Sequence, residues 1–290
     1  MLVPAYNAAD TIGDALESAL TQRPAPTEVV VSDDGSEDDL GRVLSGFGDR
    51  IRVVRGSNGG LATARNRAAA VARGDLLGLL DADDVWLPGR VAALTEAAAA
   101  RPDLSIVTTD AVVVRDDGPE PRSYYDVRHF ETEDQETAIL RNNFVFGAGA
   151  VRASALSAVG GYDPAARWAE DWDLWLRLLL RGHRAGMVRA PLYEYRRHGG
   201  SLTARKVDLA LGVQAVLRRA RPLVETPDRR SVLARTEREW AVAAVRSARA
   251  AADPRRRSLA LTAARMGGHS PRAWARLVVD GVLARPGGVR

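Results

Sequence analysis

Two groups of acidic residues have the composition of ligand-binding loops. One is Asp33-Asp-Gly-Ser36 and the other is Asp81-Ala-Asp-Asp84, and each directly follows a short apolar run that is typical of a strand. Ligands of open α/β sheets bind at the carboxyl ends of the strands, so both groups are expected at one edge of one sheet. An Asp-x-Asp turn offers carboxylate oxygens to Mg²⁺ or Mn²⁺, which bind through one or two protein carboxylates plus substrate phosphates. The sequence therefore predicts a divalent-cation site.

Each group also has a purely structural interpretation. Asp and Gly suit tight turns, and Ser36 or a neighbouring Asp could cap the next helix. The acids of 81–84 could complement the dipole of a helix that begins near Pro88. Three carboxylates within four residues repel one another unless a cation or solvent relieves them. This repulsion favours the metal interpretation, with Asp84 as a structural residue rather than a ligand.

The stretch 170–180 has the pattern of a helix with acids in its first turn. Its apolar face holds Trp172 and Trp175, and burial in a core explains these tryptophans. Glu170 and Asp171 could simply complement the helix dipole. A helix N-terminus at the ligand edge of a sheet is also where a carboxylate can reach a substrate hydroxyl. We therefore predict catalysis by Asp171, with Glu170 in a supporting role such as acceptor binding.

One histidine, His198, follows two arginines and precedes two glycines. An isolated histidine is more often a surface or packing residue than a ligand, so on these residues alone a functional role is the minor alternative. Adjacent residues of an extended segment face opposite ways. One of Arg196 and Arg197 is therefore expected to reach a phosphate group, and the other to point to solvent.

Strand and helix patterns alternate over the first hundred residues. Short apolar or β-branched runs bounded by Pro, Gly and Asp are typical of buried parallel strands, and they occur at 28–32, 51–55 and 76–80. Helical patterns lie between and after these runs, at 11–20, 61–73 and 90–100. This order predicts right-handed crossovers and an α/β sheet. Later, Gly147 and Gly149 could allow a close approach of the backbone to a ligand or could mark a bulge.

The composition excludes several kinds of site. The 290 residues include no cysteine, which excludes a disulfide scaffold, a Cys-ligated metal and a thiol nucleophile, and with only four histidines a multi-histidine metal site is not expected. The first 80 residues contain neither Gly-x-Gly-x-x-Gly nor a P-loop, so phosphate must be held otherwise. No apolar run approaches the roughly 18 to 20 residues of a membrane span. Without a signal-peptide pattern at its start, the protein is expected in the cytoplasm.

Charge divides the chain into two parts. Residues 1–200 hold 22 basic and 30 acidic side chains, whereas residues 201–290 hold 19 basic and 7 acidic ones. Proline-punctuated helical patterns fill the basic part, at 207–224, 228–252, 255–265 and 271–284. A helical appendage packed on the first part is the simplest expectation. The alternative is peripheral contact with anionic lipid at the inner face of the plasma membrane, whereas nucleic acid has little support because aromatic residues are scarce.

Seven short stretches carry a pattern that no single one of them would establish. They are Val3-Pro-Ala-Tyr-Asn7, Val29-Val-Val-Ser-Asp-Asp-Gly-Ser36, Asn58-Gly-Gly-Leu-Ala-Thr-Ala-Arg-Asn66, Leu80-Asp-Ala-Asp-Asp84, Gly160-Gly-Tyr-Asp163, Glu170-Asp-Trp-Asp-Leu-Trp-Leu-Arg177 and Tyr195-Arg-Arg-His-Gly-Gly-Ser201. In type and order they resemble the nucleotide-sugar-dependent glycosyltransferases of family 2, which have the GT-A fold. The resemblance implies a GT-A catalytic domain over 1–203, with a Rossmann-like mixed sheet and helices on both faces, and a basic α-helical region over 204–290.

The resemblance also implies a role for each matching residue. Asp34 would accept a hydrogen bond from the base, Arg65 would lie near the diphosphate or ribose, and Asp81 would face the ribose or the sugar. Asp171 would be the catalytic base. Asp83 would bind the metal directly, and His198 could approach the metal or the diphosphate. The implied nucleotide-sugar-binding residues are Pro4, Ala5, Tyr6, Asp34, Arg65, Asp81 and Arg196.

The function implied is that of an inverting glycosyltransferase with a Mn²⁺ or Mg²⁺ cofactor. It would move a sugar from a nucleoside-diphosphate sugar, with a leaning towards uridine, to a saccharide or lipid-linked acceptor in cell-surface polysaccharide or glycoconjugate synthesis. Two alternatives stay open: a non-catalytic nucleotide-sugar-binding module, and a sugar nucleotidyltransferase. The latter is expected to carry a Gly-rich triphosphate loop near its first strand, and none is present.

The first strand is short for this family. Members usually carry several more apolar residues before the Val-Pro-Ala-Tyr-Asn stretch, whereas here only residues 1–4 precede Ala5. Each large apolar side chain that is missing from a buried strand lowers the free energy of unfolding by about 1.5 to 3 kcal/mol. We therefore expect marginal stability for the chain as given, which restoring upstream residues would relieve.

Overall fold

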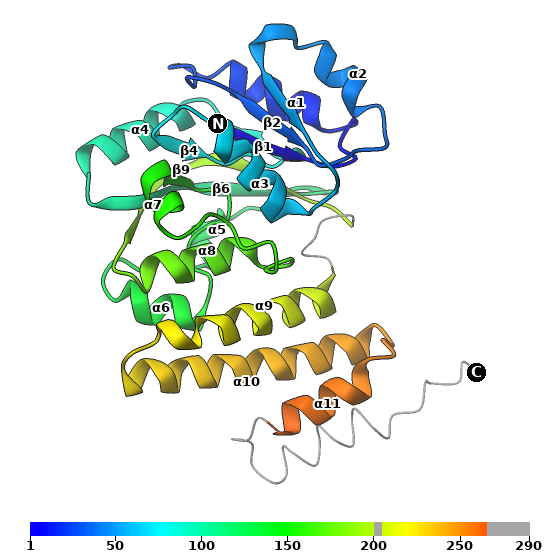
Figure 1. The fold of residues 1–290 in the computed structure, drawn as a ribbon, viewed down its shortest axis with the longest axis vertical. Helices are drawn as coiled ribbons and strands as arrows, with labels where there is room; N and C mark the ends of the chain where they lie inside the picture. Colours follow the sequence, from blue (N-terminus) through cyan, green and yellow to red (C-terminus); the bar gives the residue numbers. More distant parts are fainter. Residues whose placement is uncertain (200–204, 266–290) are drawn as a thin grey trace.

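The computed structural model describes residues 1–199 and 205–265, which form two sheets covered by helices (Figure 1). The strands are β1 (Leu2–Ala5), β2 (Val30–Asp33), β3 (Arg52–Arg55), β4 (Leu76–Gly78), β5 (Val85–Trp86), β6 (Leu104–Arg115), β7 (Gly118–Pro119), β8 (Ala150–Arg152) and β9 (Arg184–Arg197). The helices are α1 (Ile12–Leu20), α2 (Leu40–Ser45), α3 (Leu61–Val71), α4 (Arg90–Ala100), α5 (Tyr124–Val127), α6 (Gln135–Arg141), α7 (Ala153–Ala158), α8 (Glu170–Leu179), α9 (Lys206–Ala220), α10 (Pro227–Ala250) and α11 (Arg256–Arg265), with 3₁₀ turns at Gly48–Arg50 and Arg221–Leu223.

Strands β1, β2 and β3 form a parallel sheet in that order. β1 pairs with β2 along its whole length, from Leu2 opposite Val30 to Ala5 opposite Asp33. The predicted parallel arrangement is confirmed here, but the expectation that 51–55 is buried is wrong. β3 is an edge strand, paired only with β2, and Val53 is 37% exposed. One side of an edge strand has no neighbour to cover it, which explains the exposure.

The second sheet is mixed, with the order β4-β8-β6-β9-β5 and β7 paired to β6. β4 and β6 are both antiparallel to β8, whereas β6 and β9 are parallel. The strand predicted at 76–80 is therefore shorter than expected and antiparallel to its main neighbour. A single parallel bridge between Leu2 and Leu79 joins the two sheets. The mixed sheet implied by the family resemblance is confirmed.

Alternate residues of the central strands supply two hydrophobic cores. Leu2 and Val30 belong to one core, with residues of α3, α8 and α9. Val3 and Val31 belong to the other, with residues of α1, α2 and α4. Successive side chains of a strand point to opposite faces, so β1 and β2 carry apolar residues on both. Helices consequently cover both faces, as predicted.

The C-terminal helices are stacked beyond α8 in the order α9, α10, α11 (Figure 1). Val213 and Leu217 of α9 and Leu233 of α10 share a core with Trp175 of α8. The predicted helices within 207–265 are confirmed, while the one predicted at 271–284 and residue Ser201 lie outside the described residues. The boundary near residue 203 stays a prediction. In 1–199 and 205–265, no helix has the length and apolar character that crossing a membrane requires.

Candidate active site

Arg65 connects two of the predicted acidic regions. Its Nη2 donates a hydrogen bond to Asp81 Oδ1 at 2.9 Å, and its Nη1 donates to Glu170 Oε1 at 2.7 Å. Arg65 lies on α3, Asp81 follows β4, and Glu170 begins α8, 105 residues after Arg65. The structure therefore brings the Asp-x-Asp loop and the Glu-Asp pair together at one place.

The environment of Arg65 is that of a structural ion pair. The side chain is 2% exposed, and its guanidinium lies 5.4 Å from the ring centroid of Tyr162. Burial alone would lower the pKa of Arg65, but the charges of Asp81 and Glu170 outweigh it and hold the pKa well above its ordinary value. Burial raises the pKa of Glu170 to about 7 against the opposing charge of Arg65. Because both terminal nitrogens are occupied, Arg65 orients the two acids, and a contact with diphosphate would have to displace one of them.

Asp171 has different surroundings from its neighbour Glu170. Asp171 Oδ2 accepts a hydrogen bond from Asn143 Nδ2 at 2.8 Å, and Oδ1 accepts one from the backbone N–H of Trp172 at 2.7 Å. Burial raises the pKa of Asp171, although the charge of Arg65 and these hydrogen bonds favour the anion. Asp171 is partly exposed, whereas Glu170 is buried. Of the two acids, Asp171 is the one open to a substrate.

Gly147 allows the Asp171 carboxylate to fit. A Cβ atom at position 147 would lie 2.6 Å from Asp171 Oδ2, a distance that no side chain could tolerate without a shift. The close approach considered for Gly147 is thus made to the carboxylate of Asp171. At Gly149, the corresponding distance to the nearest atoms is 3.4 Å, so that position is less restricted.

Tyr193 fixes the Asp-x-Asp loop. Its hydroxyl accepts a hydrogen bond from the backbone N–H of Asp81 at 3.3 Å and donates one to Asp84 Oδ2 at 2.7 Å. Asp84 Oδ1 accepts from the backbone N–H of Arg196 at 2.8 Å. The ring of Tyr193 lies 4.7 Å from the guanidinium of Arg90, which is fully buried. Asp84 therefore ties the loop to β9, which agrees with its predicted structural role.

Asp83 and His198 form the best candidate for a metal site. Asp83 Oδ2 lies 3.0 Å from His198 Nε2, and the two side chains are 36% and 43% exposed. Burial and the charge of Asp81 raise the pKa of Asp83, so a cation would relieve a crowded carboxylate. In the part of the chain that the structure describes, no group of three or more His, Cys, Asp or Glu side chains is arranged to hold a metal. One oxygen and one nitrogen donor nevertheless fit an ion that takes its other ligands from phosphates and water.

The ends of β1 and β2 carry the residues predicted to contact the nucleotide. The backbone N–H of Asp34 donates to the carbonyl of Ala5 at 2.9 Å, so the two strand ends adjoin. Asp34 is buried, and its carboxylate accepts hydrogen bonds from the backbone N–H groups of Gly59 and Gly60 and from Arg67. It thus holds the start of α3. Any hydrogen bond from a base to Asp34 would have to share oxygens that these donors already use.

The two arginines before His198 face different surroundings. Arg196 donates to Glu194 at 2.7 Å and to Asp14 at 2.9 Å. Arg197 instead acts electrostatically on Tyr124, together with Asp171. Both side chains are half-buried, and which of the two reaches a phosphate stays a prediction. Carboxylates already occupy Arg196, so its contact with the nucleotide sugar stays a prediction.

Sequence reasoning missed Asn143 and Tyr193. A signal for Tyr193 existed, because it alternates with Tyr195 and Arg197 on one face of a strand. Asn143 lies in an irregular segment between α6 and β8, where no periodicity indicates a direction. Its role becomes visible only through its contact with Asp171.

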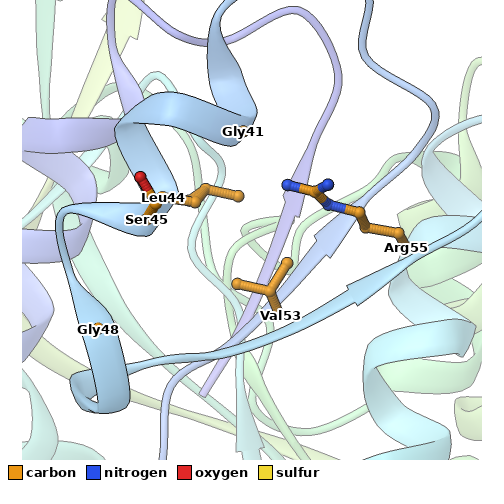
Figure 2. Close-up of a pocket in the computed structure, with 6 residues that line it drawn as sticks. All are labelled: Gly41, Leu44, Ser45, Gly48, Val53 and Arg55. Atoms are coloured by element: carbon orange, nitrogen blue, oxygen red, sulfur yellow. The ribbon is translucent and has the colours of Figure 1, made fainter.

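Two hollows on the described surface lie away from these residues. One, of about 450 Å³, lies between α2 and β3 and is shown in Figure 2. The other, of about 580 Å³, lies where α9 begins and α10 ends. Neither contains a predicted site residue. The first is lined by Gly41, Leu44, Ser45, Gly48, Val53 and Arg55.

Comparison with known proteins agrees with this geometry. The sequence model described as "Glycosyl transferase family 2" matches residues 1–160. The succinoglycan biosynthesis protein ExoU of Rhizobium meliloti is 34% identical over 224 residues, which cover 72% of this chain and 65% of ExoU. The chain therefore spans somewhat less than two thirds of that relative's length.

Solved structures show the same fold. TarS from S. aureus, in complex with UDP-GlcNAc, superposes with a TM-score of 0.65 at 18% identity, covering 97% of this chain and 88% of TarS. The mannosyltransferase PcManGT from Pyrobaculum calidifontis, in complex with GDP-Man and Mn²⁺, superposes with a TM-score of 0.65 at 20% identity, covering 98% of this chain and 80% of PcManGT. With a family match over more than half of its length and a GT-A architecture, the chain belongs to glycosyl transferase family 2.

Proposed function

We propose that the chain transfers a sugar from a nucleoside-diphosphate sugar to an acceptor hydroxyl, with inversion at the anomeric carbon. The observation that supports this most is the double ion pair of Arg65, which joins the Asp-x-Asp loop to the Glu-Asp pair of α8. The name of the relative ExoU, a succinoglycan biosynthesis protein, suggests cell-surface polysaccharide as the class of product. A saccharide or lipid-linked saccharide would be the acceptor.

Asp171 would act as the general base. It is the more exposed acid of its pair, and its raised pKa makes it a stronger base than an ordinary aspartate. Its carboxylate would take the proton of the acceptor hydroxyl while that oxygen attacks the anomeric carbon and the bond to the diphosphate oxygen breaks. Such a displacement passes through an oxocarbenium-like transition state and inverts the configuration. Glu170 and Arg65 would hold the start of α8 in position.

Asp83 and His198 would hold a divalent cation, Mn²⁺ or Mg²⁺. When bound, the cation neutralises charge that develops on the departing diphosphate. Mn²⁺ is present in the complex of the neighbour PcManGT. Tyr193 and Asp84 would keep the loop that carries Asp83 in place, because they tie it to β9.

The nucleotide would lie at the ends of β1 and β2. Tyr6 follows β1 and is 48% exposed, so its ring is open to stacking against a base. Pro4, Ala5 and Asp34 would complete this pocket, and Asp81 would face the ribose or the sugar. The neighbours were solved with UDP-GlcNAc and with GDP-Man. We retain uridine as the expected base on the strength of the sequence resemblance.

A panel of nucleotide sugars tests this proposal. Each donor is incubated with the chain and Mn²⁺, and slow release of the nucleoside diphosphate into water is measured. We expect one donor class to be hydrolysed and Asp83→Ala to abolish both the release and the Mn²⁺-dependent binding of the nucleoside diphosphate. Asp39→Ala is the matched control, because Asp39 is an exposed acid whose partner Arg42 is also exposed. Failure of every donor to bind would contradict the proposal.

The same experiment separates the alternatives. A non-catalytic nucleotide-sugar-binding module would bind a donor without releasing the nucleoside diphosphate. A nucleotidyltransferase would instead form pyrophosphate from a nucleoside triphosphate and a sugar phosphate. A cytoplasmic location and a contact between the basic region 204–290 and anionic membrane remain predictions, which co-sedimentation with vesicles of anionic lipid would test.

A further inference from the structure

We infer that the acceptor carries an anionic group near the hydroxyl that is glycosylated, and that Arg128 and Arg197 recognise this group. The inference rests on the proposed function, because it takes Asp171 as the mark of the acceptor side. Its basis is that these two cations approach Tyr124 from separate segments. Arg128 follows α5, and Arg197 ends β9.

A chain of ring contacts places these arginines near Asp171. The guanidinium carbon of Arg128 lies 4.4 Å from the ring centroid of Tyr124. Tyr124 packs on Phe146 with 4.8 Å between ring centroids, and the next residue, Gly147, is the one against which the Asp171 carboxylate fits. The ring of Tyr124 is therefore next to the segment that borders Asp171.

Arg197 reaches the same place along β9. Tyr195 contacts Phe146 with 5.7 Å between ring centroids. Arg197 lies two residues further along the strand, on the face that Tyr195 presents to Phe146. Asp171, Arg128 and Arg197 all act electrostatically on the Tyr124 hydroxyl, which agrees with these contacts.

The two arginines beside Tyr124 have no ion-pair partner among the described residues, although the carboxylate of Asp171 acts on the same ring. Burial raises the pKa of Tyr124 to about 12, so its hydroxyl is neutral at physiological pH and offers no countercharge. Within 1–199 and 205–265, the guanidinium groups of Arg128 and Arg197 form no ion pair with a carboxylate. Arg65 and Arg196, by contrast, each hold two carboxylates. This difference indicates that Arg128 and Arg197 bind a ligand.

The acceptor, rather than the donor, is the ligand that these cations face. In an inverting displacement the attacking hydroxyl approaches the anomeric carbon from the side opposite to the diphosphate. Asp171 marks the hydroxyl side, whereas Asp83 and His198 mark the diphosphate side. Guanidinium groups bind carboxylates and phosphates alike through paired hydrogen bonds. The group recognised is therefore the carboxylate of a uronic acid or a phosphate on the acceptor.

Paired glycosides test this inference on the full chain. Methyl glycosides of glucose, galactose and mannose are compared, by saturation-transfer NMR, with those of the corresponding uronic acids and 6-phosphates, in the presence of Mn²⁺ and UDP. With two solvent-screened ion pairs, we expect an anionic glycoside to bind about fivefold to tenfold more tightly than the corresponding neutral glycoside. Uronates and phosphates form separate arms, so the experiment identifies which anion is preferred. Raising the salt from 50 to 500 mM should weaken the preference.

Variants assign the preference to the two arginines. Arg128→Gln and Arg197→Gln should each reduce it about threefold, and the double variant should abolish it, with nucleoside diphosphate release from the donor unchanged. Arg122→Gln, on the same segment but not over Tyr124, is the matched control. Three results would overturn the inference: no anionic member exceeding its neutral partner, an equal effect of Arg122→Gln, or a loss of UDP affinity in place of the preference. Donor release without an anionic preference refutes only the inference, whereas the preference without any donor release refutes only the proposed function.

Discussion

Replacing Arg65 by methionine removes one cation that two acids share. The lost interactions are its charge and its hydrogen bonds to Asp81 and Glu170, at 2.9 and 2.7 Å. Removing one partner of a buried ion pair costs about 3 to 5 kcal/mol, because the remaining charge stays buried without a partner. The Asp81 side chain is 33% exposed and that of Glu170 is 9% exposed, so Glu170 accounts for most of the effect. We expect Arg65→Met to lower the free energy of unfolding by about 3 kcal/mol at pH 8.

This loss should depend on pH in a defined direction. The pKa of Glu170 is about 7 with Arg65 present, and without that cation the carboxyl would keep its proton to a still higher pH. A carboxyl whose pKa is higher in the folded than in the unfolded protein stabilises the fold below the unfolded pKa, and that contribution disappears as the pH rises through the folded pKa. The loss in Arg65→Met should therefore be larger at pH 8 than at pH 5, by up to about 1.4 kcal/mol, because pH 8 lies about one unit above the pKa of the wild-type Glu170 carboxyl.

Urea unfolding followed by tryptophan fluorescence measures these values, since Trp172 and Trp175 are buried on α8. The double variant Arg65→Met/Glu170→Gln should regain most of the stability at pH 8, because no buried charge remains. Arg42→Met is the control: its ion pair is 77% exposed on the arginine side, and its effect should stay within about 0.5 kcal/mol. The reasoning would be refuted if Arg65→Met were as stable as wild type at pH 8, or if its loss were equal at both pH values.

Two further variants address the supports of Asp171 and of the Asp-x-Asp loop. Asn143→Ala removes a hydrogen bond that favours the Asp171 anion, so the pKa of Asp171 should rise. The acid limb of the pH profile of kcat/KM should therefore move to higher pH. If that limb did not move, Asn143 would not position the base. Tyr193→Phe removes both hydrogen bonds to the loop, so calorimetry with UDP should show Mn²⁺ affinity reduced by about tenfold or more. Tyr125→Phe also loses two partly buried hydrogen bonds and should destabilise the chain with unchanged Mn²⁺ affinity. If Tyr193→Phe bound Mn²⁺ as tightly as wild type, Tyr193 would not be needed to hold the loop.

Local patterns were sufficient to predict most helices and the alternation of the first half. The apolar positions of 12–20 repeat with helical spacing, and all of them except Leu20 are buried in α1. The strand at 51–55 shows the limit of this reasoning. Its β-branched residues indicate a strand correctly, but whether a strand is central or at an edge depends on its neighbours. Only the order β1-β2-β3 shows that β3 is exposed on one side.

The contacts of the candidate site depend on residues far apart in the chain. Spacing predicts that acids follow two strands, yet nothing in the sequence near Arg65 indicates that it binds Glu170, 105 residues later. Asp34 illustrates the same point, because its partners Gly59 and Gly60 lie in the segment between β3 and α3, about 25 residues further along the chain. Asn143 lies in an irregular segment and has no periodic signal, and the alternation of Tyr193 along its strand does not say which side chain it holds. Their roles become apparent only from tertiary structure.

Turnover by Asp171→Asn tests the central claim most directly. Asparagine keeps the size of the side chain and can accept one of its two hydrogen bonds, but it cannot take the acceptor's proton. The account predicts that transfer falls by about 10² to 10⁴, while calorimetry shows unchanged binding of the nucleoside diphosphate with Mn²⁺. Transfer at the wild-type rate by Asp171→Asn would contradict it.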